Sequence, residues 1–258
     1  MVIFSCKDRF EDMMSCIYDA WVYGISLGHE QVRLCKEPVY QQDLFHEYIH
    51  VDYDEEKTNK VIRSIQRKIS WGAYISVFYA CLSIEEDAMQ AIYDFLRLGF
   101  RVGAQVLDMQ NRPEVMRMWE LRRRIGNEAT YFKEFARFTS LDSKVYLCHI
   151  EPKNNVLLLV ADHFADRMPS ENWVMVDDAR RYAVIHPKDE ESYVRELSEE
   201  EFLALRKAYS QKDEYTYLWK GFFEAIGIKE RENKKCQRNM FRMWMRKNVV
   251  EFQMDVDK

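Results

Sequence analysis

The sequence contains few of the residues that interrupt helices and strands, glycine and proline, and no closely spaced cysteines. Its 258 residues include only eight glycines and five prolines, so tight turns should be few and long helices are favoured. The six cysteines are scattered singly, and no C-x-x-C pair is present. A disulfide framework, a zinc knuckle and a cysteine-bound iron–sulfur cluster are therefore not expected, and the thiols should be reduced and mostly buried.

Long apolar runs and targeting segments are also missing. The chain has no apolar run of about eighteen residues, the least that a membrane-spanning helix needs. Its first residues, MVIFSCKDRFEDMM, lack the basic start, apolar stretch and cleavage site of a signal peptide. We therefore expect a cytoplasmic protein that does not contact a membrane.

Enzyme signatures are absent with one exception. There is no Gly-rich phosphate loop and no G-x-S-x-G elbow, but HEYIH at residues 46–50 matches H-E-x-x-H. On a helix, such histidines bind zinc and the glutamate acts as a general base. Here Pro38 lies upstream, and residues 51–54 alternate apolar and acidic side chains, which favours an extended segment. We interpret the motif as accidental and predict no metal and no cofactor.

The residues that are present indicate a folded protein rich in helices. Hydrophobic residues make up 47% and charged residues 31% of the chain, as in globular proteins. Helical periodicity extends over residues 8–21, 54–69, 70–82, 83–103 and 113–138, and short strands are predicted at 1–6 and 31–35.

After about residue 140 the periodicity changes. Strands are predicted at 144–152 and 192–197, a hairpin at 171–187, and helices at 154–168, 198–210 and within 213–252. The segment 198–210 opens with a capping signature, Ser198 followed by Glu201. We predict an α+β fold, mostly helical with a small antiparallel sheet. Residues 1–258 should form a single compact domain, with a helical block over 1–140 and a sheet plus helical tail over 141–258.

The charge of the chain is unevenly distributed. The net charge is −5, which argues against a uniformly basic nucleic-acid-binding protein. Residues 218–248, however, hold nine Lys or Arg against three Glu, a local +6, and residues 112–138 hold seven against four, a local +3. Residues 187–217 hold five against nine, a local −4. The two basic segments could form one anion-binding face.

These basic segments supply the candidate nucleic-acid contacts. In RRRIGNEATYFKEFARF, residues 122–138, basic side chains alternate with phenylalanines, and such a helix can grip phosphates while its rings stack on bases. The alternative is a helix whose phenylalanines face the core and whose charges are solvated. In IKERENKKCQRNMFRMWMRKN, residues 228–248, basic side chains at helical spacing predict an amphipathic helix that binds the phosphate backbone or a partner. The alternative is a solvated helix face. The predicted contacts are Arg123, Arg124, Lys133, Arg137, Arg231, Lys234, Lys235 and Arg238.

A third cluster lies at a predicted helix–strand junction, DHFADRMPSENWVMVDD, residues 162–178. Such junctions often present polar side chains to a ligand. The candidate catalytic residues are His163, Asp166 and Arg167, as acid/base and anion-binding groups. The alternative is a histidine with a purely structural role.

Four segments together carry a family resemblance: residues 94–103, 122–138, 150–181 and 218–237. The chain resembles a bacterial family, a domain of unknown function, whose members are described as DNA metabolism or repair proteins. The resemblance implies a neighbouring gene for a radical-SAM protein with a helix-hairpin-helix element. It also implies fusions to a uracil-DNA-glycosylase-like domain. Both associations imply DNA, and neither names a reaction.

Many positions match the family pattern. The matching residues are Lys133, Arg137, His163, Phe164, Arg167, Trp173, Trp219, Arg231, Asn233 and Gln237. The chain departs at Thr130, where the family has histidine, and the family lacks the histidines of HEYIH. We expect a DNA-associated accessory protein that works with a radical-SAM or glycosylase-type enzyme. The alternatives are an enzyme acting on a nucleotide or damaged base through His163, Asp166 and Arg167, and a protein–protein adaptor.

Overall fold

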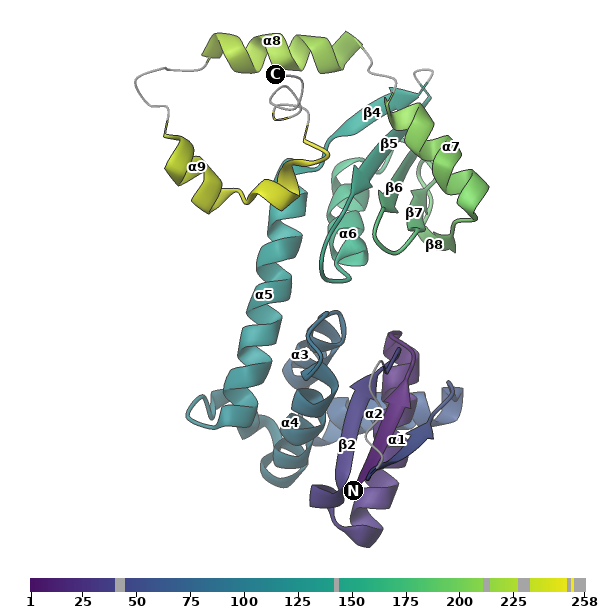
Figure 1. The fold of residues 1–258 in the computed structure, drawn as a ribbon, viewed down its shortest axis with the longest axis vertical. Coiled ribbons are helices and arrows are strands. Elements are labelled where there is room, and N and C mark those ends of the chain that lie inside the picture. Colours follow the sequence, from purple (N-terminus) through teal and green to yellow (C-terminus); the bar gives the residue numbers. More distant parts are fainter. Residues whose placement is uncertain (40–44, 142–143, 211–213, 227–232, 250–251, 253–258) are drawn as a thin grey trace. The chain divides into compact units, whose positions relative to one another are not determined.

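The computed structural model describes residues 1–39, 45–141, 144–210, 214–226, 233–249 and 252. The chain divides into two compact units, Met1–Gly126 (unit 1) and Asn127–Lys258 (unit 2) (Figure 1). The boundary between the units lies inside a helix, α5 (Pro113–Phe135). The expectation of a single compact domain stays a prediction.

The sheet of unit 1 has three parallel strands in the order β2-β1-β3. They are β1 (Val2–Cys6), β2 (Val32–Lys36) and β3 (Glu47–His50). The central strand β1 is largely buried, and helix α1 (Phe10–Leu27) connects it to β2. A crossover of this kind is what allows two consecutive strands to run parallel.

The helices of unit 1 form most of its core. After α1 come η1 (His29–Gln31), α2 (Glu55–Lys68), α3 (Trp71–Cys81), α4 (Ala88–Val102), η2 (Gly103–Asp108) and the first part of α5. The carboxylate of Asp54 accepts from the Lys57 amide at 2.9 Å and so caps α2. Gly99 lets α4 pack closely against the Ile69 side chain, because a Cβ at position 99 would lie 2.8 Å from Cδ1 of Ile69.

The sheet of unit 2 has five strands in the order β4-β5-β6-β7-β8. They are β4 (Phe138–Leu141), β5 (Val145–Ile150), β6 (Trp173–Asp177), β7 (Tyr182–His186) and β8 (Tyr193–Glu196). Helix α6 (Leu157–Arg167) connects β5 to β6, which are therefore parallel, and the other neighbours are antiparallel. The α+β class is confirmed. The expectation of one small antiparallel sheet is wrong, because α1 and α6 act as crossovers.

Helices cover both faces of this sheet (Figure 1). On one face, the ring of Phe138 packs against both Phe164 of α6 and Trp173 of β6. On the other face, Phe202 of α7 (Glu199–Ser210) packs with Leu147 and Val176. The predicted cap of α7 is confirmed: the Ser198 hydroxyl accepts from the Glu201 amide, and the Glu201 carboxylate accepts from the Ser198 amide.

The remaining elements are α8 (Glu214–Ile226), α9 (Lys234–Met240) and η4 (Met243–Arg246). The helix predicted over 113–138 ends at Phe135, because Phe138 begins β4 and its ring packs against Phe164 at 4.9 Å. Within the described residues, no helix is long and apolar enough to cross a membrane.

Candidate functional site

The HEYIH motif lies on a strand and not on a helix. Glu47–His50 forms β3, and His46 precedes it in a bend. The zinc interpretation fails on this geometry, because it needs both histidines on one helical face. Nδ1 of His50 lies 2.6 Å from Glu37 and Nε2 lies 3.1 Å from Asp52. Hydrogen bonds to these carboxylates raise the pKa of His50, and the bond from His50 lowers the pKa of Glu37.

His163, Asp166 and Arg167 lie on the solvent side of α6. The apolar residues Val160 and Phe164 of this helix are buried, whereas Asp166 and Arg167 are exposed. The His163 ring is half-buried beside Phe164, at 5.2 Å. None of the three lines a cavity described here, and the catalytic hypothesis stays a prediction.

Three of the four candidate phosphate contacts in and beside α5 each contact a neighbouring group. Arg124 pairs with Glu85, and Arg123 lies over the Trp119 ring at 4.8 Å. Arg137 donates to the Glu134 and Ala136 carbonyls at 3.1 Å each.

Lys133 faces the acidic side of α6. Burial raises the pKa of Asp162, and the nearby Lys133 opposes this rise, while Asp166 adds to it. The Asp162 carboxylate therefore reduces the positive potential that Lys133 can offer to a phosphate.

The phenylalanines of residues 122–138 pack inside unit 2. Phe132 is buried, Phe135 stacks on Phe241 with ring centroids 4.1 Å apart, and Phe138 packs against Phe164 and Trp173. This arrangement matches the alternative interpretation, in which the rings face the core. They are not free to stack on bases.

The most basic stretch of unit 2 consists of α9, η4 and the residues beside them, 233–249, which we call the basic segment. It contains six Lys or Arg residues and no Asp or Glu. Phe241, Met245 and Val249, spaced four residues apart, are all buried, with exposed fractions of 4%, 6% and 3%. Apolar residues therefore anchor this segment on unit 2, in spite of its charge.

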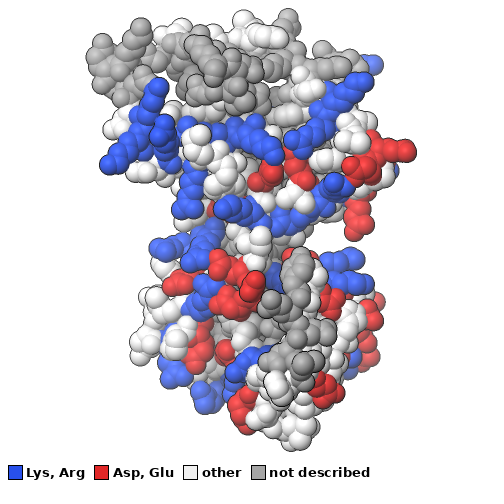
Figure 2. Space-filling view, in the orientation of Figure 1, with Lys and Arg blue, Asp and Glu red and all other residues white. Residues whose placement is uncertain are grey.

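The basic side chains of this segment point mainly to solvent. Lys234, Lys235, Arg238 and Arg242 are exposed. Among the described residues, Lys235, Arg238 and Arg242 have no ion-pair partner. Figure 2 shows Lys and Arg side chains gathered over much of one face of unit 2. Arg231 lies outside the described residues.

Arg242 is a further candidate contact that the sequence analysis did not name, although its place four residues after Arg238 could have indicated it. The other two cations of the segment hold its fold. Arg246 donates to the carbonyls of Gln237 and Phe241 at 3.0 and 2.9 Å, and Lys247 pairs with Glu151.

The β5–α6 loop is fixed by a polar network beside the basic segment. The buried Glu128 carboxylate accepts from the Lys153 amide at 2.6 Å, and Arg180 donates to the Pro152 carbonyl at 3.3 Å. The Lys153 ammonium lies 5.0 Å from the Trp244 ring. Glu128 thus has a structural role, because it holds a loop whose lysine contacts the basic segment.

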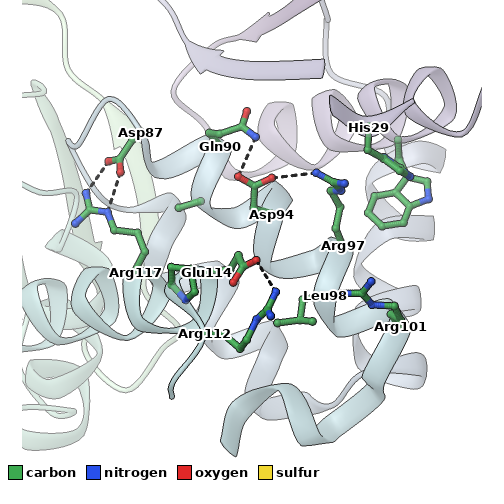
Figure 3. Close-up of a pocket in the computed structure, with 13 residues that line it drawn as sticks. His29, Asp87, Gln90, Asp94, Arg97, Leu98, Arg101, Arg112, Glu114 and Arg117 are labelled. Carbon is green, nitrogen blue, oxygen red and sulfur yellow. Dashed lines mark hydrogen bonds and ion pairs between the residues drawn. The ribbon is translucent and has the colours of Figure 1, made fainter. Parts of the chain in front are cut away.

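Unit 1 contains a cavity of about 800 Å³ between α4, the start of α5, α1 and η1 (Figure 3). Its lining is rich in arginine, and the sequence reasoning assigned it no role. The lining residues include Trp21, His29, Asp94, Arg97, Arg101 and Arg112. Arg117 and Asp87 form a two-contact pair at 2.8 and 2.6 Å, seen away from His29 in this view.

Comparison with known families shows to which family the chain belongs. Residues 86–251 match the family model of a domain of unknown function, DUF4130. The chain belongs to this family. The matched region includes α4, all of α5 and the basic segment. No curated protein matches the chain. The DUF4130 description names no activity, so the DNA association implied by the resemblance stays a prediction.

Proposed function

We propose that this DUF4130 protein is a DNA-associated accessory protein whose basic segment binds the phosphate backbone. One observation carries the proposal: a segment with six basic and no acidic residues is anchored on unit 2 by buried Phe241, Met245 and Val249. The exposed cations Lys235, Arg238 and Arg242 have no acidic partner within the described part of the chain.

The anchoring matters because it separates this segment from an ordinary solvated helix. A free helix of seven residues, the length of α9, is not stable in water. Here the stacked rings of Phe135 and Phe241 and the Asn233 side chain, which accepts from the Cys236 amide at 2.9 Å, hold the helix in place. Cations held in this way lose less conformational entropy when they bind phosphates.

The proposed partners are DNA and the type of enzyme that the resemblance implies, a radical-SAM helix-hairpin-helix or glycosylase-type protein. In this proposal the partner supplies the chemistry, and the DUF4130 chain supplies sequence-independent contact to the backbone. Since the whole chain carries a net charge of −5, we expect weak binding by the chain alone.

Fluorescence anisotropy with a labelled single strand and a labelled duplex tests the proposal. The triple substitution Lys235→Ala/Arg238→Ala/Arg242→Ala should lower affinity on the order of a hundredfold near 0.1 M salt if each side chain binds one phosphate. The decrease should be similar for different base sequences, because phosphate contacts carry no sequence information.

A matched control in unit 1 separates local contact from net charge. Arg63→Ala/Arg67→Ala/Lys68→Ala removes the same charge from exposed positions of α2 and should change affinity little. Equal losses in both triple variants would reduce the effect to net charge and contradict the proposal. Absence of DNA binding at low salt, with and without the partner enzyme, would also overturn it and favour the adaptor alternative.

A further inference from the structure

The arginine-lined cavity of unit 1 is not used by the proposed function. Its volume of about 800 Å³ is in the range of small-molecule sites, roughly 300 to 1,000 Å³. Two of its four arginines are committed to structure. Arg117 contacts Asp87, Glu85 and Glu120, and Arg112 pairs with Glu114 at 3.2 Å.

The other two arginines are available to a ligand. Arg97 and Arg101 are one turn apart on α4 and both line the cavity. Arg97 has a single long ion pair, 3.5 Å to Asp94, and 38% of its side chain is exposed. Arg101 is exposed and has no ion-pair partner among the described residues. Arginines at this spacing can bind the oxygens of one phosphate or carboxylate.

A neutral histidine lies in the same cavity. Nδ1 of His29 is 2.7 Å from the Tyr93 hydroxyl, which in turn is 3.1 Å from the Ala20 carbonyl. Because a carbonyl only accepts, the tyrosine donates to it and the histidine donates to the tyrosine oxygen. Nε2 of His29 is therefore left as an acceptor. Burial and the charge of Arg97 lower the pKa of His29, which favours the neutral ring.

These groups demand two different features of one ligand. The arginines favour an anion, whereas the Nε2 lone pair repels an oxyanion and needs a hydroxyl or N–H donor. Figure 3 shows His29, Arg97 and Arg101 at the same end of the cavity. The guanidinium groups of Arg101, which has no ion pair among the described residues, and of Arg97, whose pair with Asp94 is long, together match the charge of a phosphate monoester at pH 7, roughly −1.5 to −2.

We propose that the cavity of unit 1 binds a small phosphate monoester that also carries a hydroxyl group, with Arg97 and Arg101 on the phosphate and Nε2 of His29 accepting from the hydroxyl. Trp21 and Leu98 supply the apolar part of the lining. The site is independent of the DNA contacts proposed for unit 2.

Isothermal titration calorimetry with the full chain tests this site. The probes are ribose 5-phosphate, inorganic phosphate and ribose. Ribose 5-phosphate should bind, inorganic phosphate should bind more weakly, and ribose should not bind measurably. Arg101→Gln should weaken the binding of ribose 5-phosphate by about tenfold, and adding Arg97→Gln by about tenfold more. Arg63→Gln, at an exposed position of α2, is the matched control.

His29→Phe tests the hydroxyl contact separately. It should weaken the binding of ribose 5-phosphate and leave that of inorganic phosphate unchanged, which global unfolding would not do. The proposal is overturned if ribose 5-phosphate fails to bind, or if the double arginine variant binds it as tightly as the Arg63→Gln control. It is also overturned if His29→Phe weakens both phosphates equally. None of these results bears on DNA binding by unit 2.

Discussion

The basic residues of α5 and those of the basic segment differ in what surrounds them. Arg117 and Arg124 are held by carboxylates of Glu85 and Asp87, whereas Lys235 and Arg238 have no acidic partner in the described chain. Both regions are basic by count. The comparison teaches that the number of cations in a segment does not measure its capacity to bind an anion. A cation already neutralised by a carboxylate contributes little potential.

The same contrast distinguishes the aromatic residues. The rings of Phe132 and Phe135 face the interior of unit 2, so the basic and aromatic side chains of α5 do not form one surface. In the basic segment, the buried Phe241 and Met245 fix the position of the cations. Three substitutions and one salt titration test this difference between the two regions.

The largest effect on stability and on DNA affinity is expected when Phe241, which anchors the basic segment on unit 2, is replaced. Phe241→Ala deletes a buried ring that stacks on Phe135 at 4.1 Å, and substitutions of this kind cost about 3 to 5 kcal/mol. Hydrogen exchange should show faster exchange of the amides of residues 233–249, together with weaker DNA binding. The matched variant Met243→Ala, at an exposed position, should leave both unchanged. Full retention of DNA affinity in Phe241→Ala would show that the anchoring is irrelevant.

An intermediate effect is expected at the paired arginine. Arg117→Ala leaves the carboxylates of Asp87, Glu85 and Glu120 without their shared cation. Since the arginine is only partly buried, we expect a loss of about 1 to 2 kcal/mol in the free energy of unfolding, measured with urea. DNA affinity should not change. A loss of DNA affinity without a loss of stability would contradict the distinction between paired and unpaired cations.

The smallest effect is expected at the exposed pair of His50 and Glu37. The raised pKa of His50 gives stability that is present at low pH and disappears as pH rises through that pKa. The lowered pKa of Glu37 gives stability that disappears as pH falls through its own pKa. The pair should therefore stabilise unit 1 most between these two values, by less than about 1 kcal/mol because it is exposed. Thermal melts of His50→Gln against pH should lack this maximum, and His46→Gln serves as the control.

Much of the fold was predictable because periodicity reports burial directly. The alternation in residues 171–187 predicted the β6–β7 hairpin, and Ser198 with Glu201 predicted the start of α7; both predictions are confirmed. Strand direction was not predictable in this way. An alternating strand such as β5 has the same pattern whether its neighbour is parallel or antiparallel, and the difference depends on where α6 packs.

The candidate sites were less predictable, because partners that are distant in sequence decide them. Nothing in residues 122–124 shows that Glu85 will neutralise Arg124. Likewise, the cavity of unit 1 brings His29 together with Arg97 only through the packing of η1 near α4. Spacing along the sequence could have indicated Arg97 with Arg101, and Arg238 with Arg242, but not which of them lack a carboxylate partner.

The most direct test of the central claim is the salt dependence of DNA binding in two variants that lose the same charge. One is Lys235→Ala/Arg238→Ala in the basic segment, and the other is Arg117→Ala/Arg124→Ala in α5, where both arginines are paired with carboxylates. The slope of log K against log salt should flatten by about 1 for each phosphate contact removed. We predict a slope smaller by about 2 for the basic-segment variant and an unchanged slope for the α5 variant. Equal flattening in both, or a change in the α5 variant alone, would contradict the account.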